Sequence, residues 1–385
     1  MHTPPDVRAA RLVLNALPNI GPVTCRRLDD ALPGGPEAIF RASHKELISV
    51  KGVGEVMAET LLQWRKYFNL EREQEKMAAR NLRFVIPEDG DAYPSLLREI
   101  YDPPLGLYST SAYHSGSQCI AIVGTRRRTA YGEKMAHTLA RELAASGWCV
   151  VSGLARGIDT AVHEGALEGG GVTVAVLGCG VDIVYPPENL DLYRKIAANG
   201  VVFSEFFLGR VADKQTFPMR NRIVSGMSRA VVVVESDEGG GSMITARFAG
   251  EQGRTVCAVP GRVDQISSRG CHALIRDGAT LVTCVDDILS EIGAISSKPA
   301  QGELRLEEGP AAAVGRAVAA TAASGVKPGS EEEKILNALS GGTALSMDAL
   351  CDKTGMPIHS LSGTLLMMEL NRLVSKMPDG SFEAV

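Results

Sequence analysis

The sequence has no stretch of about 18 consecutive apolar residues, the length that a membrane-spanning helix requires. Its first residues, MHTPPDVRAARLVLNALPN, contain neither a long apolar stretch nor a small-residue cleavage site of the kind that ends a signal peptide. We therefore expect no membrane span and no signal peptide, and we predict a cytoplasmic protein.

The eight cysteines are scattered along the chain, and none are paired at the short spacing of zinc ligands. Several of them lie in apolar, strand-like runs. Disulfides are not expected, because the pattern is typical of reduced, buried thiols in a cytoplasmic protein. We predict no metal site and no cofactor.

Positive charge is not in excess, because the formal net charge is −5. The hydrophobic fraction of 45% and the charged fraction of 22% are ordinary for a soluble globular protein. These values exclude a protein that is coated in positive charge, but they allow one basic face.

The length of 385 residues allows two or three domains. The predicted fold class is α/β: a Rossmann-like, mostly parallel sheet with a helical domain before it and a winged-helix-like domain after it. The predicted segments are an N-terminal helical domain (1–70), a bridging segment (71–115), the Rossmann-like domain (116–292), a flexible linker (293–330) and the winged-helix-like domain (331–385).

Two stretches of the N-terminal domain have a similar pattern, LPNIGPVTCRRL (17–28) and ISVKGVGEVMAETL (48–61). Each has an apolar residue, a tight glycine turn and then a helix, as in a helix-hairpin-helix motif. Such a turn offers backbone N–H groups to a phosphate, but the motif also serves as a packing unit. Both interpretations stay open from the sequence.

The middle of the chain alternates short apolar runs with amphipathic helical patterns. Continuous apolar runs indicate strands that are buried on both faces, as in a parallel sheet. Ligands of such sheets bind at the carboxyl ends of the strands. The runs are IAIV (120–123), WCVV (148–151), VTVAVL (172–177), VVFS (201–204), AVVVVE (230–235), TVCAV (255–259) and ATLV (279–282).

The segments that follow these runs are rich in arginine, glycine and helix starts. If the strands are parallel, these segments converge on one edge and bring many cationic groups together there, including those of Arg127 and Arg128. The candidate DNA-binding residues are Gly124, Thr125, Arg126, Arg127, Ser152, Gly153, Arg156, Lys214, Phe217, Arg220, Asn221, Arg222, Gly240, Gly241, Ser242 and Arg247.

This set of residue types favours a nucleic acid over a dinucleotide. A dinucleotide has one pyrophosphate, whereas the charge of a nucleic-acid backbone repeats along a track. Phe217 adds a ring on which an unpaired base stacks, with about 1–3 kcal/mol per base. Alone, an arginine triplet is usually solvated surface and a lone Phe before Pro is usually core; their convergence favours single-stranded nucleic acid. The histidines share no spacing, and we assign them no catalytic role.

Several stretches of the middle segment resemble the DprA family, the DNA-processing protein A that is also called Smf. They are AIVGTRRRTAYG, VVSGLARGIDTAVHEGAL, VAVLGCGVDIVYPPEN, FPMRNRIVSGMS, GGGSMITARFAGEQGRTVCAVPG and GCHALIRDGA. The resemblance implies a non-enzymatic bacterial protein that binds single-stranded DNA, helps load RecA onto incoming DNA in natural transformation, and forms a homodimer through its Rossmann-like domain.

The resemblance also implies roles for single residues. The arginine of the family's GTR motif falls on Arg126. The basic and aromatic groups before and within its FPxRN motif fall on Lys214 and Phe217, with Arg220 and Arg222 as neighbours. The chain departs from the family at a later motif, where Gly270, Cys271 and His272 stand in place of Gly-x-Asn.

The C-terminal module has an acidic balance, and its predicted helix over 357–371 contains neither Lys nor Arg. A winged helix that reads DNA needs basic contacts to phosphate. We therefore expect this module to contact a protein.

Two alternative functions remain open. A Rossmann-like phosphoribohydrolase that acts on nucleotides would also place a glycine-rich turn after a strand. It would need an acidic residue just beyond that turn, and the first one is Glu251, although Asp237 and Glu238 precede the turn. A transcription regulator would act through the winged helix.

Overall fold

The computed structural model describes residues 6–113, 118–294, 330–339, 345–371, 373–376 and 381–384. The chain divides into two compact units, Met1–Pro299 and Ala300–Val385. Residues 295–329 of the predicted linker lie outside the described residues.

The first residues fold into helices that form two helical hairpins. Glycines stand at the N-caps of α2 and α5, and Pro22 follows Gly21 at the first helical position, where a missing N–H costs nothing. Ser43 and Glu46 form a capping box at the start of α4. The elements are α1 (Val7–Ala16), α2 (Pro22–Ala31), α3 (Pro36–Ile39), α4 (His44–Ser49), α5 (Glu55–Leu62), η1 (Trp64–Lys66) and α6 (Leu70–Ala79).

A nine-stranded sheet forms the centre of the first unit, in the order β1-β2-β6-β5-β4-β3-β7-β8-β9. Neighbouring strands from β3 to β9 are parallel, which confirms the predicted sheet. The strands are β1 (Arg83–Val85), β2 (Leu107–Ser109), β3 (Cys119–Gly124), β4 (Cys149–Ser152), β5 (Thr173–Leu177), β6 (Val201–Ser204), β7 (Ala230–Val234), β8 (Thr255–Ala258) and β9 (Thr280–Leu281).

The bridging segment belongs to this sheet. Its strand β2 pairs antiparallel with β6, and β1 pairs antiparallel with β2. Two 3-10 helices, η2 (Pro87–Ala92) and η3 (Ser95–Arg98), lie between these strands. Each strand has only three residues, which is too short for a hydrophobic period to reveal that it joins the sheet.

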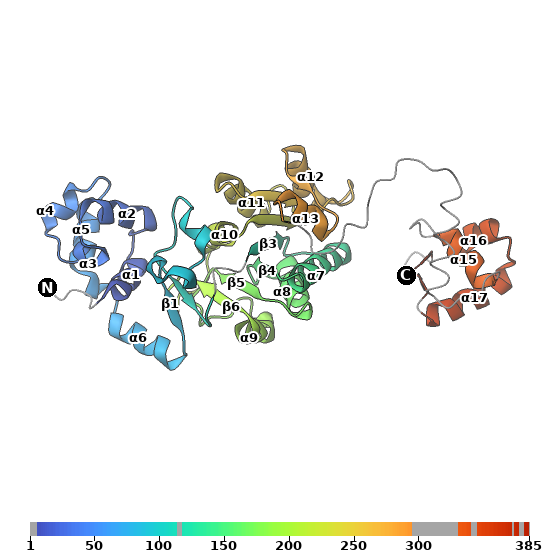
Figure 1. The fold of residues 1–385 in the computed structure, drawn as a ribbon, viewed down its shortest axis with the longest axis horizontal. Coiled ribbons are helices and arrows are strands. Elements are labelled where there is room, and N and C mark those ends of the chain that lie inside the picture. The colour runs from blue at the N-terminus through green and yellow to red at the C-terminus, as the bar shows by residue number, and fades with distance from the viewer. Residues whose placement is uncertain are drawn as a thin grey trace. The chain divides into compact units, whose positions relative to one another are not determined.

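Helices cover both faces of the sheet (Figure 1). Ile120 and Ile122 of β3 pack into the cluster of α7, α8 and α13, whereas Ala121 and Val123 pack into that of α10, α11 and α12. This alternation explains why the strand is continuously apolar. The helices are α7 (Ala130–Ala145), α8 (Ile158–Glu168), α9 (Leu190–Asn199), α10 (Thr216–Gly226), α11 (Gly241–Glu251), α12 (Arg269–Arg276) and α13 (Val285–Glu291).

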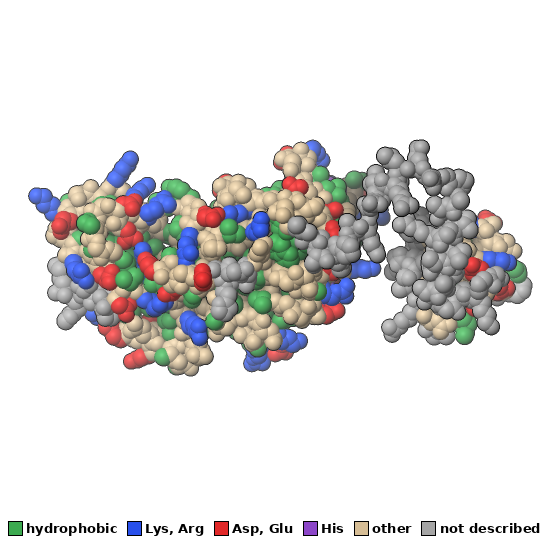
Figure 2. All heavy atoms as spheres, viewed as in Figure 1, with side chains coloured by type: hydrophobic (Ala, Val, Ile, Leu, Met, Phe, Trp, Pro, Cys, Tyr) green, Lys and Arg blue, Asp and Glu red, His purple; other side chains and the backbone are tan. Residues whose placement is uncertain are grey.

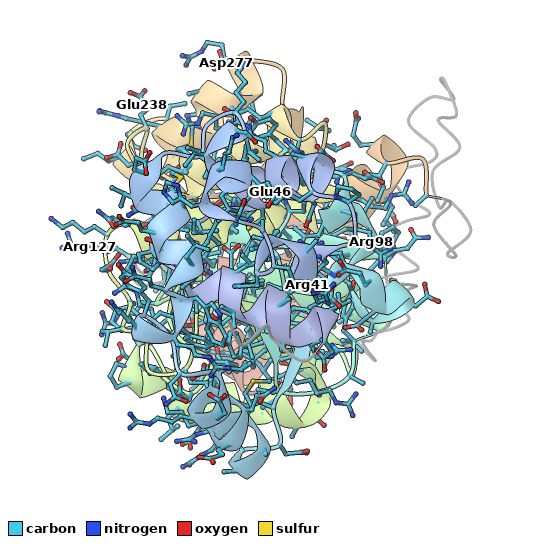
Figure 3. The ribbon with its side chains drawn as sticks, turned by 90° about the vertical axis from the view of Figure 1, so that its left-hand side faces the viewer. Arg41, Glu46, Arg98, Arg127, Glu238 and Asp277 are labelled. Carbon is cyan, nitrogen blue, oxygen red and sulfur yellow. The ribbon has the colours of Figure 1, made fainter. Side chains whose placement is uncertain are left out.

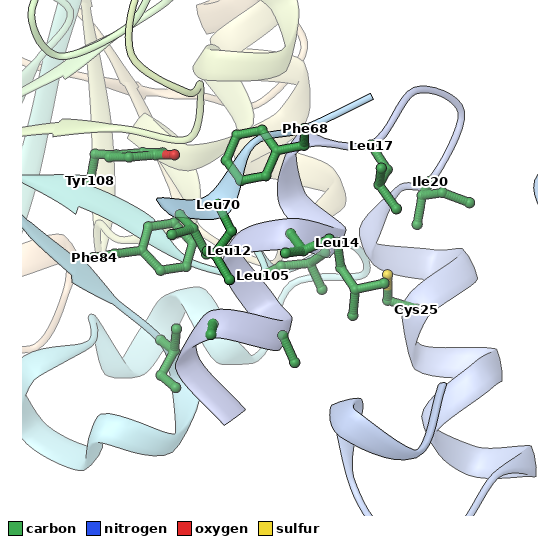
Figure 4. Close-up of a cluster of buried hydrophobic side chains, with 14 of the residues drawn as sticks. Leu12, Leu14, Leu17, Ile20, Cys25, Phe68, Leu70, Phe84, Leu105 and Tyr108 are labelled. Atoms are coloured by element: carbon green, nitrogen blue, oxygen red, sulfur yellow. The ribbon is translucent and has the colours of Figure 1, made fainter. Parts of the chain in front are cut away.

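The helical hairpins share a hydrophobic cluster with the edge of the sheet (Figure 4). Leu12 and Phe68 from the helical region lie in the same cluster as Phe84 and Tyr108 from β1 and β2. The Tyr108 hydroxyl also donates a 2.9 Å hydrogen bond to the buried Glu73 of α6. The helical domain is therefore joined to the β1–β2 edge by a common core.

The second unit contains α15 (Glu331–Leu339), α16 (Met347–Thr354), α17 (Ile358–Leu370), β10 (Val374–Lys376) and β11 (Phe382–Ala384). The two strands pair antiparallel, so three helices and a hairpin follow in the predicted order. Their core includes Ile335, Leu350, Leu361 and Leu365. The predicted winged-helix architecture is confirmed.

Candidate nucleic-acid interface

A cavity of about 400 Å³ lies at the carboxyl ends of β3 and β7, between the first turns of α10 and α11. Its wall brings together residues from four separate segments of the chain. Nine of the predicted site residues line it: Gly124, Thr125, Arg126, Phe217, Arg220, Asn221, Gly240, Gly241 and Ser242.

The three consecutive arginines after β3 point to three different environments. The guanidinium carbon of Arg126 lies 4.7 Å from the centroid of the Phe217 ring, at the wall of the cavity. Arg127 is exposed and extends away from the protein (Figure 3). Arg128 is held by an ion pair with Glu133 of α7, at 2.8 Å. Only Arg126 of the three therefore lines the cavity.

Phe217 contacts a second aromatic ring in addition to Arg126. The ring of Tyr185 is 5.8 Å from that of Phe217 in a tilted arrangement, and Tyr185 is 37% exposed. Phe217 packs over Gly178, where a Cβ would approach within 3.2 Å of the ring. Sequence reasoning missed Tyr185, although it lies in the segment after β5, the place where contact residues were expected.

Arg220 forms the floor of the cavity and is 5% exposed. Its Nη1 donates a 2.9 Å hydrogen bond to the carbonyl oxygen of Val176. Burial lowers the pKa of Arg220, and the neighbouring Asp159 carboxylate opposes this change. Gly153 leaves space for the guanidinium, because a Cβ at residue 153 would overlap it. Gly153 is therefore a packing requirement of the buried arginine.

Burial raises the pKa of Asp159, while Arg220 and hydrogen bonds from the backbone N–H groups of Ala155 and Gly153 lower it. Those two N–H groups donate to Oδ2 of Asp159, at 3.3 Å and 3.1 Å. The carboxylate thus compensates the buried guanidinium and fixes the loop after β4.

The N-terminus of α11 forms the wall opposite Phe217. Gly240 is its N-cap, and the first-turn N–H groups of a helix have no intrahelical partner. The positive end of the helix dipole favours an anion there by about 0.3–1 kcal/mol. Gly241 is exposed and has no atom within 4 Å of its Cβ position, so a ligand can approach its backbone. Asn221 Nδ2 donates to Gly241 O at 3.3 Å and fastens α10 to this turn.

Seven predicted residues do not line the cavity. Ser152 is buried and donates to Ile122 O at 2.7 Å, so it is a strand contact. Arg156 pairs with Glu188, and Arg247 pairs with Glu251 at 3.6 Å. Arg127 and Lys214 are exposed outside the cavity. The other two are Gly153, described above, and Arg222.

The structure differs most clearly from the predicted DNA-binding set at Arg222. Its side chain is 5% exposed and contacts Glu205 Oε1 at 2.5 Å and Asp102 Oδ2 at 3.2 Å. Burial lowers the pKa of Arg222, but Coulombic attraction to Glu205 and Asp102 outweighs burial and the pKa is raised. Arg222 therefore has a structural role as a buried, paired cation, and it is not available to a phosphate.

The structure places less unpaired positive charge at this edge of the sheet than the sequence predicts, because carboxylates neutralise several of the cations. Glu188, Glu205 and Glu251 supply these partners, and two of the three lie in other segments of the chain. Figure 2 shows the same mixture of signs on the visible face of the protein. Position after a strand predicts which edge a residue occupies, but not which way its side chain turns.

Neither the described cysteines nor the described histidines line the cavity. Six of the eight cysteines are buried. No group of three metal-ligating side chains occurs within the described residues. No helix within those residues is both long and apolar enough to cross a membrane. His272 lies in the motif at which the chain differs from the DprA family. It donates a hydrogen bond through Nε2 to Gly261 O at 3.0 Å and is not part of the cavity wall.

The family model for DNA recombination-mediator protein A matches residues 83–293. The chain belongs to this family. A model of the DprA winged helix domain matches residues 319–380, and a helix-hairpin-helix model matches residues 35–64, which include the second of the two predicted hairpins.

The chain is similar in sequence to Smf and DprA proteins over more than half of its length. It is 34% identical to Protein Smf of Synechocystis over 95% of this chain and 96% of that protein. It is 41% identical to the DNA processing protein DprA of Bacillus subtilis over 54% of this chain and 71% of that protein. The crystal structure of DprA from Streptococcus pneumoniae has a TM-score of 0.63 and 31% identity, and covers 74% of this chain and 98% of that one.

Proposed function

We propose that this DprA-family protein is a non-enzymatic recombination mediator that binds single-stranded DNA in the cavity between α10 and α11. The observation that carries the proposal is the Arg126–Phe217 pair, in which a guanidinium and an aromatic ring share one wall of a cavity. A base stacks on the ring, and phosphates contact Arg126 and the N-terminus of α11. Tyr185 joins the proposed contact set through its contact with Phe217.

The cavity residues of the proposed set are Gly124, Thr125, Arg126, Phe217, Arg220, Asn221, Gly240, Gly241 and Ser242. Arg127 and Lys214 are proposed to contact the phosphates of the strand outside the cavity, since both are exposed. Arg220 acts from the floor, where its buried charge increases the attraction for a phosphate.

Family membership supports a proposal for the wider biological role. In this role the cytoplasmic protein helps load RecA onto incoming single strands during natural transformation, and it forms a homodimer through its Rossmann-like domain. Val263 and Ile266, between β8 and α12, are 87% and 60% exposed and are candidate dimer contacts. If Ile266→Asp left a dimer intact in sedimentation equilibrium, this face would not be the interface.

The winged-helix unit is proposed to contact a protein. Its helix α17 exposes Ile358, Leu366 and Met367, each more than half exposed. Apolar side chains on the recognition helix of a winged helix do not provide the phosphate contacts that DNA binding needs.

The proposal is tested by titrating the full chain into fluorescent oligo-dT at several salt concentrations. The logarithm of the binding constant should fall by about 0.7 per logarithmic unit of salt for each neutralised phosphate. A binding constant that does not depend on salt would contradict the proposal. Incubation with nucleoside monophosphates should release no free base, whereas release would favour the phosphoribohydrolase alternative.

A further inference from the structure

A second contact between an arginine and an aromatic ring lies outside the cavity. The guanidinium carbon of Arg26, on α2, lies 5.2 Å from the centroid of the Tyr101 ring. Arg26 Nη1 also donates a 2.9 Å hydrogen bond to Tyr101 O. Tyr101 is 69% exposed, so most of its ring remains accessible. The pair has the same chemistry as Arg126 and Phe217.

Two more exposed cations lie on α2 and on the turn that α2 contacts. Arg27 follows Arg26 on α2 and is exposed. Its Nη1 lies against the turn of the second hairpin, 2.5 Å from the Cβ position of Gly52. Lys51 precedes that glycine and is also exposed. Among the described ion pairs, neither Arg27 nor Lys51 has a carboxylate partner, so their charge is not neutralised as that of Arg156 is.

This surface is connected to the cavity through α10. Asp102, the residue after Tyr101, accepts the 3.2 Å contact from Arg222 Nε. Arg222 follows Phe217 on α10 by five positions, which corresponds to about 7.5 Å along the helix axis. Glu205, the second partner of Arg222, accepts a 2.6 Å hydrogen bond from Asn15 of α1 through its carbonyl oxygen. The contacts of Arg222 with Asp102 and Glu205, together with that of Asn15 with Glu205, therefore hold the helical domain beside the helix that carries Phe217.

We propose that Tyr101, Arg26, Arg27 and Lys51 form a second binding surface for single-stranded nucleic acid, onto which a strand leaving the cavity continues. The inference rests on the proposed function. An exposed tyrosine ring accepts an unpaired base, and the guanidinium above it strengthens this platform by a cation–π interaction. Arg27 and Lys51 supply the phosphate contacts next to it. A paired base inside a duplex cannot stack on the ring, so the platform favours a single strand.

The experiment compares an oligo-dT of about 6 nucleotides with one of about 25, because site sizes of single-strand binding modules run from about 4 to 16 nucleotides. Both are titrated by fluorescence anisotropy with the full chain. Tyr101→Ala should weaken binding of the long strand about fivefold or more, in line with a lost stacking energy of about 1–3 kcal/mol, and should leave the short strand unaffected. Tyr101→Phe should restore binding of the long strand.

Tyr67→Ala is the matched control, since Tyr67 is a 53% exposed tyrosine of the same helical domain and should affect neither oligonucleotide. The double variant Arg27→Ala, Lys51→Ala should reduce the salt dependence of long-strand binding by about 0.7 per lost phosphate contact. Thermal unfolding of each variant verifies that the domain stays folded.

Unchanged affinity of Tyr101→Ala for the long strand, with normal binding of the short one, would overturn the second surface and leave the proposed function intact. Failure of the unmodified protein to bind the short strand would contradict the proposed function itself. If the variants weakened binding of duplex DNA and not of the long single strand, the surface would be a duplex contact of the helix-hairpin-helix region and the inference would be wrong.

Discussion

Arg126 and Phe217 come from different segments of the chain, yet the guanidinium carbon of Arg126 lies 4.7 Å from the centroid of the Phe217 ring. Arg126 follows β3, and Phe217 lies in the first turn of α10. The parallel sheet brings both segments to the same edge, where they form one wall of the cavity. In the proposed function, this relationship joins a phosphate contact and a base-stacking surface in a single site.

Replacement of the Phe217 ring should reduce affinity for single-stranded DNA. Phe217→Leu keeps an apolar side chain over Gly178 but removes the aromatic face, so we expect a loss of about 1–3 kcal/mol in binding oligo-dT. Fluorescence anisotropy measures the affinity. Phe217→Tyr is the matched control and should retain most of it; equal affinities for Leu and Phe at this position would exclude base stacking here.

Removal of the Arg126 charge should weaken binding about tenfold or more, because a charged hydrogen bond contributes about 1.5–3 kcal/mol. Arg247→Ala is the matched control. Arg247 also contacts a ring, that of Phe248 at 5.8 Å, but it pairs with Glu251 and lies outside the cavity wall. A larger loss for Arg247→Ala than for Arg126→Ala, measured in the same titration, would place the strand elsewhere.

The sequence predicted the strands and the edge well, and side-chain directions less well. Continuous apolar runs of β-branched residues leave little alternative to a parallel sheet buried on both faces, as Ile120 to Val123 illustrate. The direction of Arg222 depends on Glu205 and Asp102, which approach it only in the folded chain. The three-residue strands β1 and β2 were not recognised as part of the sheet, because pairing with β6 stabilises them more than their own pattern does.

Two glycines of the predicted site should respond differently to alanine. At Gly124, a Cβ would overlap the carbonyl oxygen of Val234, so we expect Gly124→Ala to destabilise the fold by about 1–3 kcal/mol or more. At Gly241 there is no neighbour within 4 Å, and Gly241→Ala should fold normally. Urea unfolding compares the two. Equal stability of both variants would show that the close packing of Gly124 at the end of β3 is not required.

Arg222→Met should reduce stability and not DNA recognition. The variant leaves Glu205 buried without its guanidinium partner, which typically costs about 3–5 kcal/mol. Chemical denaturation should show this loss. Binding of a short oligo-dT of about 6 nucleotides by the folded fraction should be nearly unchanged, since Arg222 does not line the cavity. A stable variant with lost binding would restore Arg222 as a DNA contact.

His163 should make stability depend on pH. Burial, and then the charge of Arg220, lowers the pKa of His163 to about 3. Thr173 donates its hydroxyl proton to Val150 O and so accepts from Nδ1–H of His163, at 2.8 Å, which leaves Nε2 without a proton or a partner in the described residues. Since the unfolded histidine has a pKa of about 6.5, the unfolded state binds the extra proton below that pH.

This stabilisation is fully present above about pH 6.5 and is lost as the pH falls toward 3. At pH 4.5 the loss should reach about 2–3 kcal/mol. Urea midpoints measured between these values should fall less steeply for His163→Gln than for the unmodified protein. Parallel pH dependences of the two proteins would assign the acid sensitivity to other groups.

The most direct measurement is a crystal structure of the protein with a short oligo-dT. We predict a thymine base stacked on Phe217, with a phosphate near Arg126 and the N-terminus of α11. An oligonucleotide bound on another surface, with the cavity between α10 and α11 left empty, would contradict this prediction.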